Sequence, residues 1–275
     1  MSLPMGAIIA AAALQAAATA SPPPTSPAAT ADSPSNEQRI ADAASLGRLL
    51  YLFDQAAWVS SDALVAAVPK DQLAGVGGYV IEMPDRQTMR VTYYRGEAAA
   101  AQAFFVADVR AGKVVRQELL AAPVALTAEQ TRLARARDVA AERARAREYK
   151  PCTPAPFNTV VLPSRPGGPI LVYLLTAQQD AATYPMGGNY RVIVGPDGSA
   201  LASRPYSVSC LSLSAPKLPA GAKPVGFTVT HLLDPVPTEL HVLASYRMRS
   251  PLIVAASDKS IWTVRGNTIA PAKVD

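Results

Sequence analysis

Helical periodicity in this chain stops near residue 151, and this change constrains the fold more than any other feature. Before it, Ser35-Asn-Glu-Gln38 and Thr127-Ala-Glu-Gln130 are capping boxes, each of which predicts the start of a helix. After it, Pro and Gly become frequent and short β-like runs replace the helical pattern. We therefore predict an α+β fold, with a helix plus an antiparallel sheet in the amino half and mostly antiparallel β hairpins in the carboxyl half.

The amino half contains two segments with helical spacing and three with strand patterns. Leu46, Leu49, Leu50 and Phe53 recur at helical spacing and predict a helix over 36–58, and a second short helix is expected through 63–68, capped by Asp62. Alternation predicts a half-buried strand over 88–94, and two further strands are expected over 103–109 and 114–120, joined across Ala111-Gly112. The second capping box predicts an Arg-rich helix over 128–148, which Pro151 stops.

The carboxyl half is expected to consist of strands joined by turns. Pro196-Asp-Gly198 is a strong turn signal, and Asp234-Pro-Val-Pro237 is expected to form a tight connection between two strands. The strands are expected over 170–176, 190–194, 200–209, 225–233, 239–246, 252–256 and 261–265.

The first residues predict export. Gly6 to Ala20 is apolar and Ala-rich and ends Ala18-Thr19-Ala20, the small-x-small pattern that precedes signal-peptide cleavage. We expect a signal peptide over 1–20, a Pro/Ser/Ala-rich tether over 21–35, an α+β region over 36–150 and a β-rich region over 151–275. Because residues 1–5 contain no Lys or Arg, the alternative is an Ala-rich leader without export function. The predicted location is periplasmic or secreted.

Two cysteines, Cys152 and Cys210, are present, and an even count in an oxidising compartment favours a disulfide bond between them. Their spacing fits neither a redox motif nor a four-Cys zinc site. The alternative is a pair of buried free thiols.

Positive charge is concentrated in the Arg-rich helix. Residues 132–150 carry seven Arg or Lys and three Asp or Glu, a net charge of +4 against +5 for the whole chain. Five cations fall on about one third of the helix circumference and could form an anion-contact surface: Arg132, Arg135, Arg143, Arg147 and Lys150. An acidic envelope component would be its partner; an exported protein meets no chromosome, so we expect no nucleic acid. The alternative is a solvated helix with internal ion pairs.

The chain has only two histidines, His231 and His241. Together with Glu239 they are residue types that bind zinc, so these three residues are the candidate metal ligands. In a hairpin with a four-residue loop, His231 and His241 point to opposite faces, whereas a five-residue loop would pair them directly. We expect the four-residue loop, and therefore no shared metal ion. The alternative for His231 is a satisfied, half-buried residue.

No apolar run reaches the length of a transmembrane segment, and no P-loop, G-x-S-x-G, C-x-x-C or H-E-x-x-H motif is present. We expect no cofactor. The first functional hypothesis is an exported, non-enzymatic protein that acts by binding an unknown ligand. The second is a metal-dependent hydrolase that uses His231, Glu239 and His241.

Two segments carry a resemblance. The run 171–176 leading to Tyr184-Pro-Met-Gly-Gly-Asn-Tyr190, together with the run 230–242, resembles uncharacterised exported bacterial proteins. The resemblance covers the carboxyl half and implies no activity.

Overall fold

The computed structural model describes residues 34–163, 165, 167–214 and 225–272. The predicted signal peptide and residues 21–33 of the predicted tether lie outside the described residues. The two regions predicted on either side of residue 151 share their packing, because Leu50 and Tyr173 belong to the same apolar core. By its contacts the chain from Pro34 to Asp275 forms one unit.

Helix α1 (Asn36–Ala67) begins where the first capping box predicted, with the Ser35 Oγ accepting a hydrogen bond from the Gln38 amide. It continues through Asp62, so the separate short helix predicted over 63–68 is wrong. No Gly or Pro interrupts residues 48–68, and the Ser60 hydroxyl donates back to the Ala57 carbonyl within the helix. The helix ends at Val68, directly before Pro69 and a 3₁₀ turn (Lys70–Leu73).

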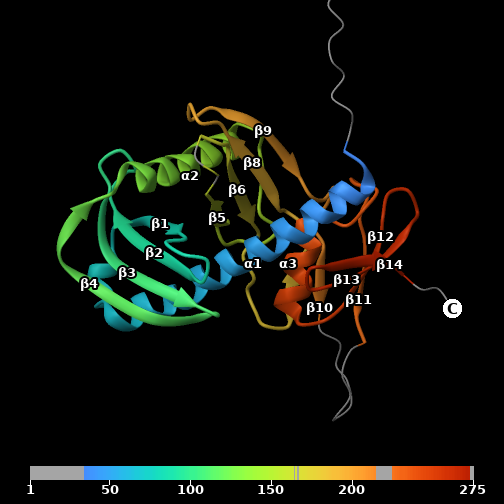
Figure 1. Ribbon diagram of the computed structural model, residues 1–275, viewed down its shortest axis with the longest axis horizontal. Coiled ribbons are helices and arrows are strands. Elements are labelled where there is room, and N and C mark those ends of the chain that lie inside the picture. Colours follow the sequence, from blue (N-terminus) through green and yellow to red (C-terminus); the bar gives the residue numbers. More distant parts are fainter. Residues whose placement is uncertain (1–33, 164, 166, 215–224, 273–275) are drawn as a thin grey trace, which may run out of the picture. The chain divides into compact units, whose positions relative to one another are not determined.

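The first sheet is antiparallel in the order β1-β2-β3-β4, as predicted for the amino half. Its strands are β1 (Val76–Glu82), β2 (Thr88–Arg95), β3 (Gln102–Arg110) and β4 (Lys113–Ala125). The turn between β3 and β4 needs two residues with positive φ, and Ala111 (46°) and Gly112 (72°) provide them. One face packs on α1 through Val91, Tyr93 and Phe105 (Figure 1).

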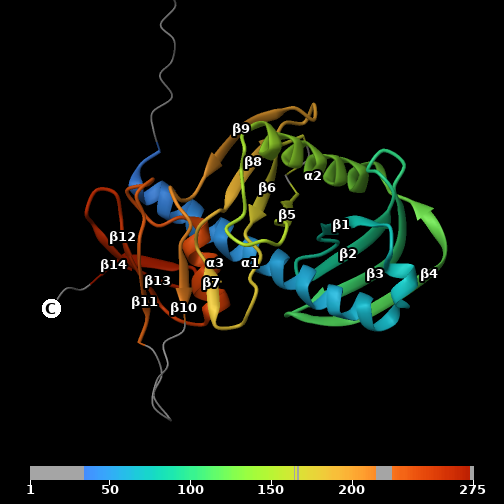
Figure 2. The same cartoon turned by 180° about the vertical axis from the view of Figure 1, so that it is seen from behind.

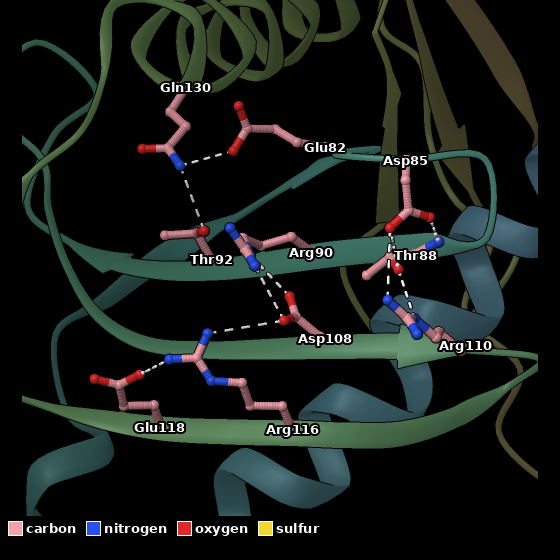
Figure 3. A network of polar contacts seen from close by, with 10 residues as sticks. All are labelled: Glu82, Asp85, Thr88, Arg90, Thr92, Asp108, Arg110, Arg116, Glu118 and Gln130. Carbon is pink, nitrogen blue, oxygen red and sulfur yellow. Dashed lines mark hydrogen bonds and ion pairs between the residues drawn. The ribbon is translucent and has the colours of Figure 1, made fainter.

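The opposite face of this sheet carries a row of polar contacts (Figure 3). The Arg90 guanidinium donates to Asp108 at 2.8 Å, and Gln130 of the next helix donates to Glu82 at 2.7 Å. Because helix and polar row cover this face, Thr92 and Tyr94 are as buried as the residues that face α1. The prediction that this strand is half-buried is therefore wrong.

Helix α2 (Ala128–Ala146) starts with the predicted capping box, since Thr127 and Gln130 exchange both hydrogen bonds. It covers one face of a second antiparallel sheet, in the order β5-β6-β8-β9 (Figure 2). The other face of this sheet packs against α1 and α3. Burial on both faces explains why β6 is an uninterrupted apolar run. These strands are β5 (Asn158–Leu162), β6 (Ile170–Leu175), β8 (Tyr190–Val194) and β9 (Ala200–Pro205).

The segment predicted as a strand over 239–246 is instead helix α3 (Glu239–Met248). It connects two parallel strands, β11 (Phe227–Thr230) and β12 (Leu252–Ala255), and a parallel pair requires a crossover instead of a hairpin. Residues Glu239 to Ser245 are all buried, because α3 packs on α1, on its own sheet and on the β6 sheet. An apolar run that is buried all round has no helical stripe to identify it.

The remaining elements complete the carboxyl half. Strands β13 (Ile261–Arg265) and β14 (Thr268–Pro271) extend the β11–β12 sheet, and β7 (Thr183–Pro185) pairs with β10 (Ser212–Ser214). Apart from the β11–β12 pair, the strand pairs are antiparallel, so the predicted α+β class is confirmed. Helix α3 crosses α1 closely at Gly47, where an added Cβ would lie 2.4 Å from the Cβ of Val242.

Candidate functional site

The two histidines lie side by side. Their ring centroids are 4.7 Å apart and the rings meet edge to face at 78°. The predicted hairpin register, with the side chains on opposite faces, is wrong because no hairpin exists. His231 follows β11, whereas His241 sits in the first turn of α3 and its Nδ1 accepts a hydrogen bond from the Thr238 amide at 3.0 Å. His241 thus acts as a helix cap.

Glu239 does not join the histidines. Its carboxylate accepts hydrogen bonds from Tyr173 at 2.9 Å, from Arg191 at 2.8 Å and from Tyr206. Burial, together with this carboxylate, raises the pKa of both tyrosines well above the usual value. In the described ranges no group of three or more His, Cys, Asp or Glu side chains is placed to hold a metal ion.

His231 is instead part of an ion-pair cluster. Its Nε2 lies 2.8 Å from Asp234, and Asp234 also pairs with Arg204 of β9. Burial opposes the charge, but the hydrogen bonds from His231 and Arg204 hold the pKa of Asp234 well below its usual range. Burial lowers the pKa of His241 to about 3, with the neighbouring His231 adding to the effect. The neutral His241 is the form that caps α3.

Arg191 and Arg204 are opposite each other on β8 and β9, and Tyr173 is the partner of Arg191 on β6. This cross-strand row faces the amino end of α3, where Asp234 and Glu239 neutralise the two arginines. We name these seven residues the α3 cluster: Tyr173, Arg191, Arg204, His231, Asp234, Glu239 and His241. Its groups bond one another, which fastens α3 to the β6 sheet.

Some cations of the Arg-rich helix bond other side chains, and others are exposed to solvent. Arg132 pairs with Glu129 at 2.8 Å, and Arg143 donates to Ser203 at 3.2 Å. The hollow beside Arg132 and Arg135, of about 380 Å³, is also lined by Asp138, Glu142 and Asp197. These carboxylates oppose a concentrated positive field. The exposed cations of the predicted anion-contact surface are Arg135, Arg147 and Lys150, and an acidic partner stays a prediction.

The predicted disulfide is confirmed. Cys152 and Cys210 are joined with a Cα–Cα distance of 5.5 Å. Their neighbours pin the start of the loop between β6 and β7, because the Cys152 amide donates to Thr176 and the Thr153 hydroxyl donates to the Ala177 carbonyl. A disulfide fits an oxidising, non-cytoplasmic compartment. In the described part of the chain, no helix is both long and apolar enough to cross a membrane.

A hollow with a volume of about 640 Å³ lies beside α1. We call it the α1 groove. Helix α1, the β6–β7 loop and the end of α3 form its walls. It is lined by Tyr51, Asp54, Gln55, Trp58, Gln178, Gln179, Asp180, Ala181, Tyr246, Arg247 and Arg249.

Several side chains of the α1 groove have no partner among the described residues. No hydrogen bond or ion pair engages the side chains of Gln55, Trp58, Gln179 or Arg249, and the indole of Trp58 is 59% exposed. By contrast, Asp54 is buried and pairs with Arg247, which is partly buried. The polar groups without partners therefore lie around a hollow whose floor contains the Asp54–Arg247 ion pair.

The sequence analysis missed the α1 groove, although a signal for it was present. Tyr51, Gln55 and Trp58 lie within about 60° of one another around the helix axis, opposite the apolar stripe through Leu50 and Phe53. A tryptophan on the polar side of an amphipathic helix is such a signal, because large aromatic residues are mostly buried.

Comparison with known proteins adds no identification, since no protein-family model, no curated protein and no solved structure matches this chain.

Proposed function

We propose that this protein is exported, to the periplasm or beyond the cell, and acts by binding a ligand in the α1 groove instead of catalysing a reaction. The observation that supports this most directly is the contrast in bonding. The side chains suited to acid–base or metal chemistry are committed to internal partners in the α3 cluster, whereas the free polar and aromatic side chains line the groove. Binding sites commonly combine such a preformed hollow with a few polar groups.

The second hypothesis, a metal-dependent hydrolase built on His231, Glu239 and His241, draws no support from the described residues. The Glu239 carboxylate is occupied by two tyrosines and an arginine, and the Nδ1 of His241 accepts from the cap of α3. A metal would have to displace these bonds, each of which satisfies a buried group.

Export is tested by amino-terminal sequencing of the protein from the envelope and culture-fluid fractions. We expect the mature chain to begin at or near Ser21. Intact Met1 on the stable product would overturn the export part of the proposal while leaving the binding part untouched.

Binding is tested by a thermal-shift screen of the wild type and Trp58→Ala against separate peptide, saccharide and lipid fractions of the cell envelope. A ligand at about 100 times its Kd stabilises by about 2.7 kcal/mol, which raises the Tm of a domain of this size by roughly 5–10 °C. We expect one fraction to raise the Tm of the wild type but not of Trp58→Ala. Metal-dependent turnover that His231→Ala abolishes would overturn the non-enzymatic function.

A further inference from the structure

The α1 groove continues on the other side of Trp58. A second hollow, of about 260 Å³, is lined by Trp58 and Asp54 together with Ser61, Asp62, Tyr79 and Asn158. The exposed indole therefore stands between two hollows along α1. This arrangement suits an extended ligand with one unit on each side of the tryptophan better than a single compact molecule.

Two aromatic side chains of the groove, Tyr51 and Tyr246, are held in place before any ligand arrives. Tyr51 of α1 and Tyr246 of α3 stack with their centroids 4.7 Å apart, and the Tyr246 hydroxyl donates to Asn267. Trp58 lies on the same side of α1, two turns after Tyr51. A flat indole face with negative π density attracts the C–H groups of a ring that stacks on it. The C–H face of a sugar ring has this shape and polarity.

The polar side chains around the indole suit hydroxyl groups. Gln55 and Gln179 are free of internal bonds, and an amide offers both donors and an acceptor, as a hydroxyl does. The β6–β7 loop that carries Gln179 is also fixed, because Gln178 donates to the Asp180 carbonyl and Asp180 accepts from the Ala182 amide. Preorganised groups lose less entropy when a ligand binds.

The charges of the larger hollow balance. Asp54 and Asp180 oppose Arg247 and Arg249, so the formal sum is zero. A polyanion or a polycation would gain no net attraction from this surface. The second hollow adds the carboxylate of Asp62 and no cation, so the larger hollow is balanced and the smaller one opposes a polyanion. Together with the free amides, this favours an uncharged polar ligand.

A peptide that binds by adding a strand would meet an obstructed edge at this groove. The strand next to the groove is β5, an edge strand, but its Thr159 carbonyl already accepts a hydrogen bond from the Tyr79 hydroxyl at 2.9 Å. Strand addition needs free main-chain groups along the edge. The groove presents side chains for hydrogen bonding instead.

We infer that the α1 groove binds a neutral oligosaccharide chain, with one sugar ring stacked on Trp58 and its neighbours bonded through their hydroxyls by Gln55 and Gln179. This inference rests on the proposed binding function and names its ligand class.

Isothermal titration calorimetry with chitotetraose, cellotetraose and maltotetraose at millimolar concentration tests it on the full mature chain. We expect at least one tetrasaccharide to bind, and Trp58→Ala and Gln179→Ala each to weaken its binding by roughly tenfold or more. Gln179 is exposed on a loop, so its variant does not depend on the core for folding. Trp262→Phe is the matched control, because it alters the only other tryptophan. In that variant, saccharide should still change the emission of Trp58.

The outcomes separate the ligand class from the function. If none of the three tetrasaccharides binds the wild type, the saccharide assignment is overturned. If an envelope peptide or lipid then binds in a Trp58-dependent manner, the binding function stands. If a saccharide binds equally to the wild type, Trp58→Ala and Gln179→Ala, the site is not the α1 groove and this inference fails.

Discussion

The α3 cluster and the α1 groove are two polar regions that both contact α3, yet they use polar groups in opposite ways. In the α3 cluster, Glu239, Asp234 and both histidines are buried. Glu239, Asp234 and His231 bond one another or the β6 sheet, and His241 bonds Thr238 at the start of α3. The single unpartnered buried atom there is the Nε of Arg191, among the described residues. In the α1 groove, the amides of Gln55 and Gln179 and the indole of Trp58 have no partner among the described residues. Residue type alone therefore shows what chemistry a side chain could perform. Its hydrogen bonds show whether the fold already uses that side chain or leaves it available to a ligand.

The largest effect is expected in the α3 cluster. Glu239→Ala would leave the Arg191 charge without its carboxylate and two buried tyrosine hydroxyls without an acceptor. We expect a loss of about 3–5 kcal/mol in the free energy of unfolding, because removal of one partner strands a buried charge. Urea denaturation measures the loss, and Gln179→Ala in the groove is the paired variant, expected within about 0.5 kcal/mol of the wild type. Similar losses at both positions would remove the distinction between the two regions.

The disulfide also affects the α1 groove. The residues next to it anchor the β6–β7 loop, and this loop forms one wall of the groove. Cys152→Ser with Cys210→Ser frees a loop with a sequence separation of 58 residues, and we expect a loss of about 2–4 kcal/mol. The fixed position of Thr176 and Ala177 should also loosen, so ligand binding should weaken even where the protein remains folded. Denaturation and calorimetry on the double variant measure both effects. Unchanged affinity in a folded variant would show that the loop holds its shape without the bond.

Acid should weaken the α3 cluster more than the groove. The pKa of His241 is about 3 when folded, below its ordinary value of 6.5, so the unfolded chain binds the proton more readily. Stability due to neutral His241 is therefore complete above about pH 6.5 and falls as the pH is lowered toward 3, by up to about 1.4 kcal/mol per pH unit. The low pKa of Asp234 adds a further loss only at more acidic pH.

His241→Gln tests this assignment, because Gln at the third helical position keeps the capping bond but does not titrate. Urea denaturation between pH 7 and pH 4 should show a shallower pH dependence in this variant. The same slope in both proteins would assign the acid sensitivity to another group.

Local signals predicted the parts of the fold that local forces determine. The hairpin between β3 and β4 followed from two strand-like runs joined across Ala111-Gly112, and the start of α2 followed from Thr127 and Gln130. The helix at 239–248 could not be predicted in this way, because its burial on all sides comes from three distant elements. Its capping residue, His241, is also an unusual partner for Thr238.

The candidate site was the least predictable part for the same reason. The cysteine pair was correct because two cysteines allow only one pairing. The histidines were sought as ligands because of their type. Each instead bonds a residue three positions away, His231 to Asp234 and His241 to Thr238, in a loop and helix start that were predicted as a hairpin. The α1 groove combines residues from α1, from the β6–β7 loop and from the end of α3, so only the Trp58 side of α1 was visible in the sequence.

The smallest expected effect concerns Arg249, at the junction of the two regions. It caps α3 in the left-handed conformation, with φ of 49°, where glycine is the usual residue. Its exposed side chain lines the α1 groove. Arg249→Gly removes the backbone strain but makes the unfolded chain more flexible, so we expect a net gain of only about 0.5 kcal/mol in stability. We also expect ligand binding in the groove to weaken, because a free cation and its donors are lost. A variant that is less stable but binds the ligand with unchanged affinity would contradict this prediction. Arg249 would then contribute to the stability of α3 and not to the α1 groove.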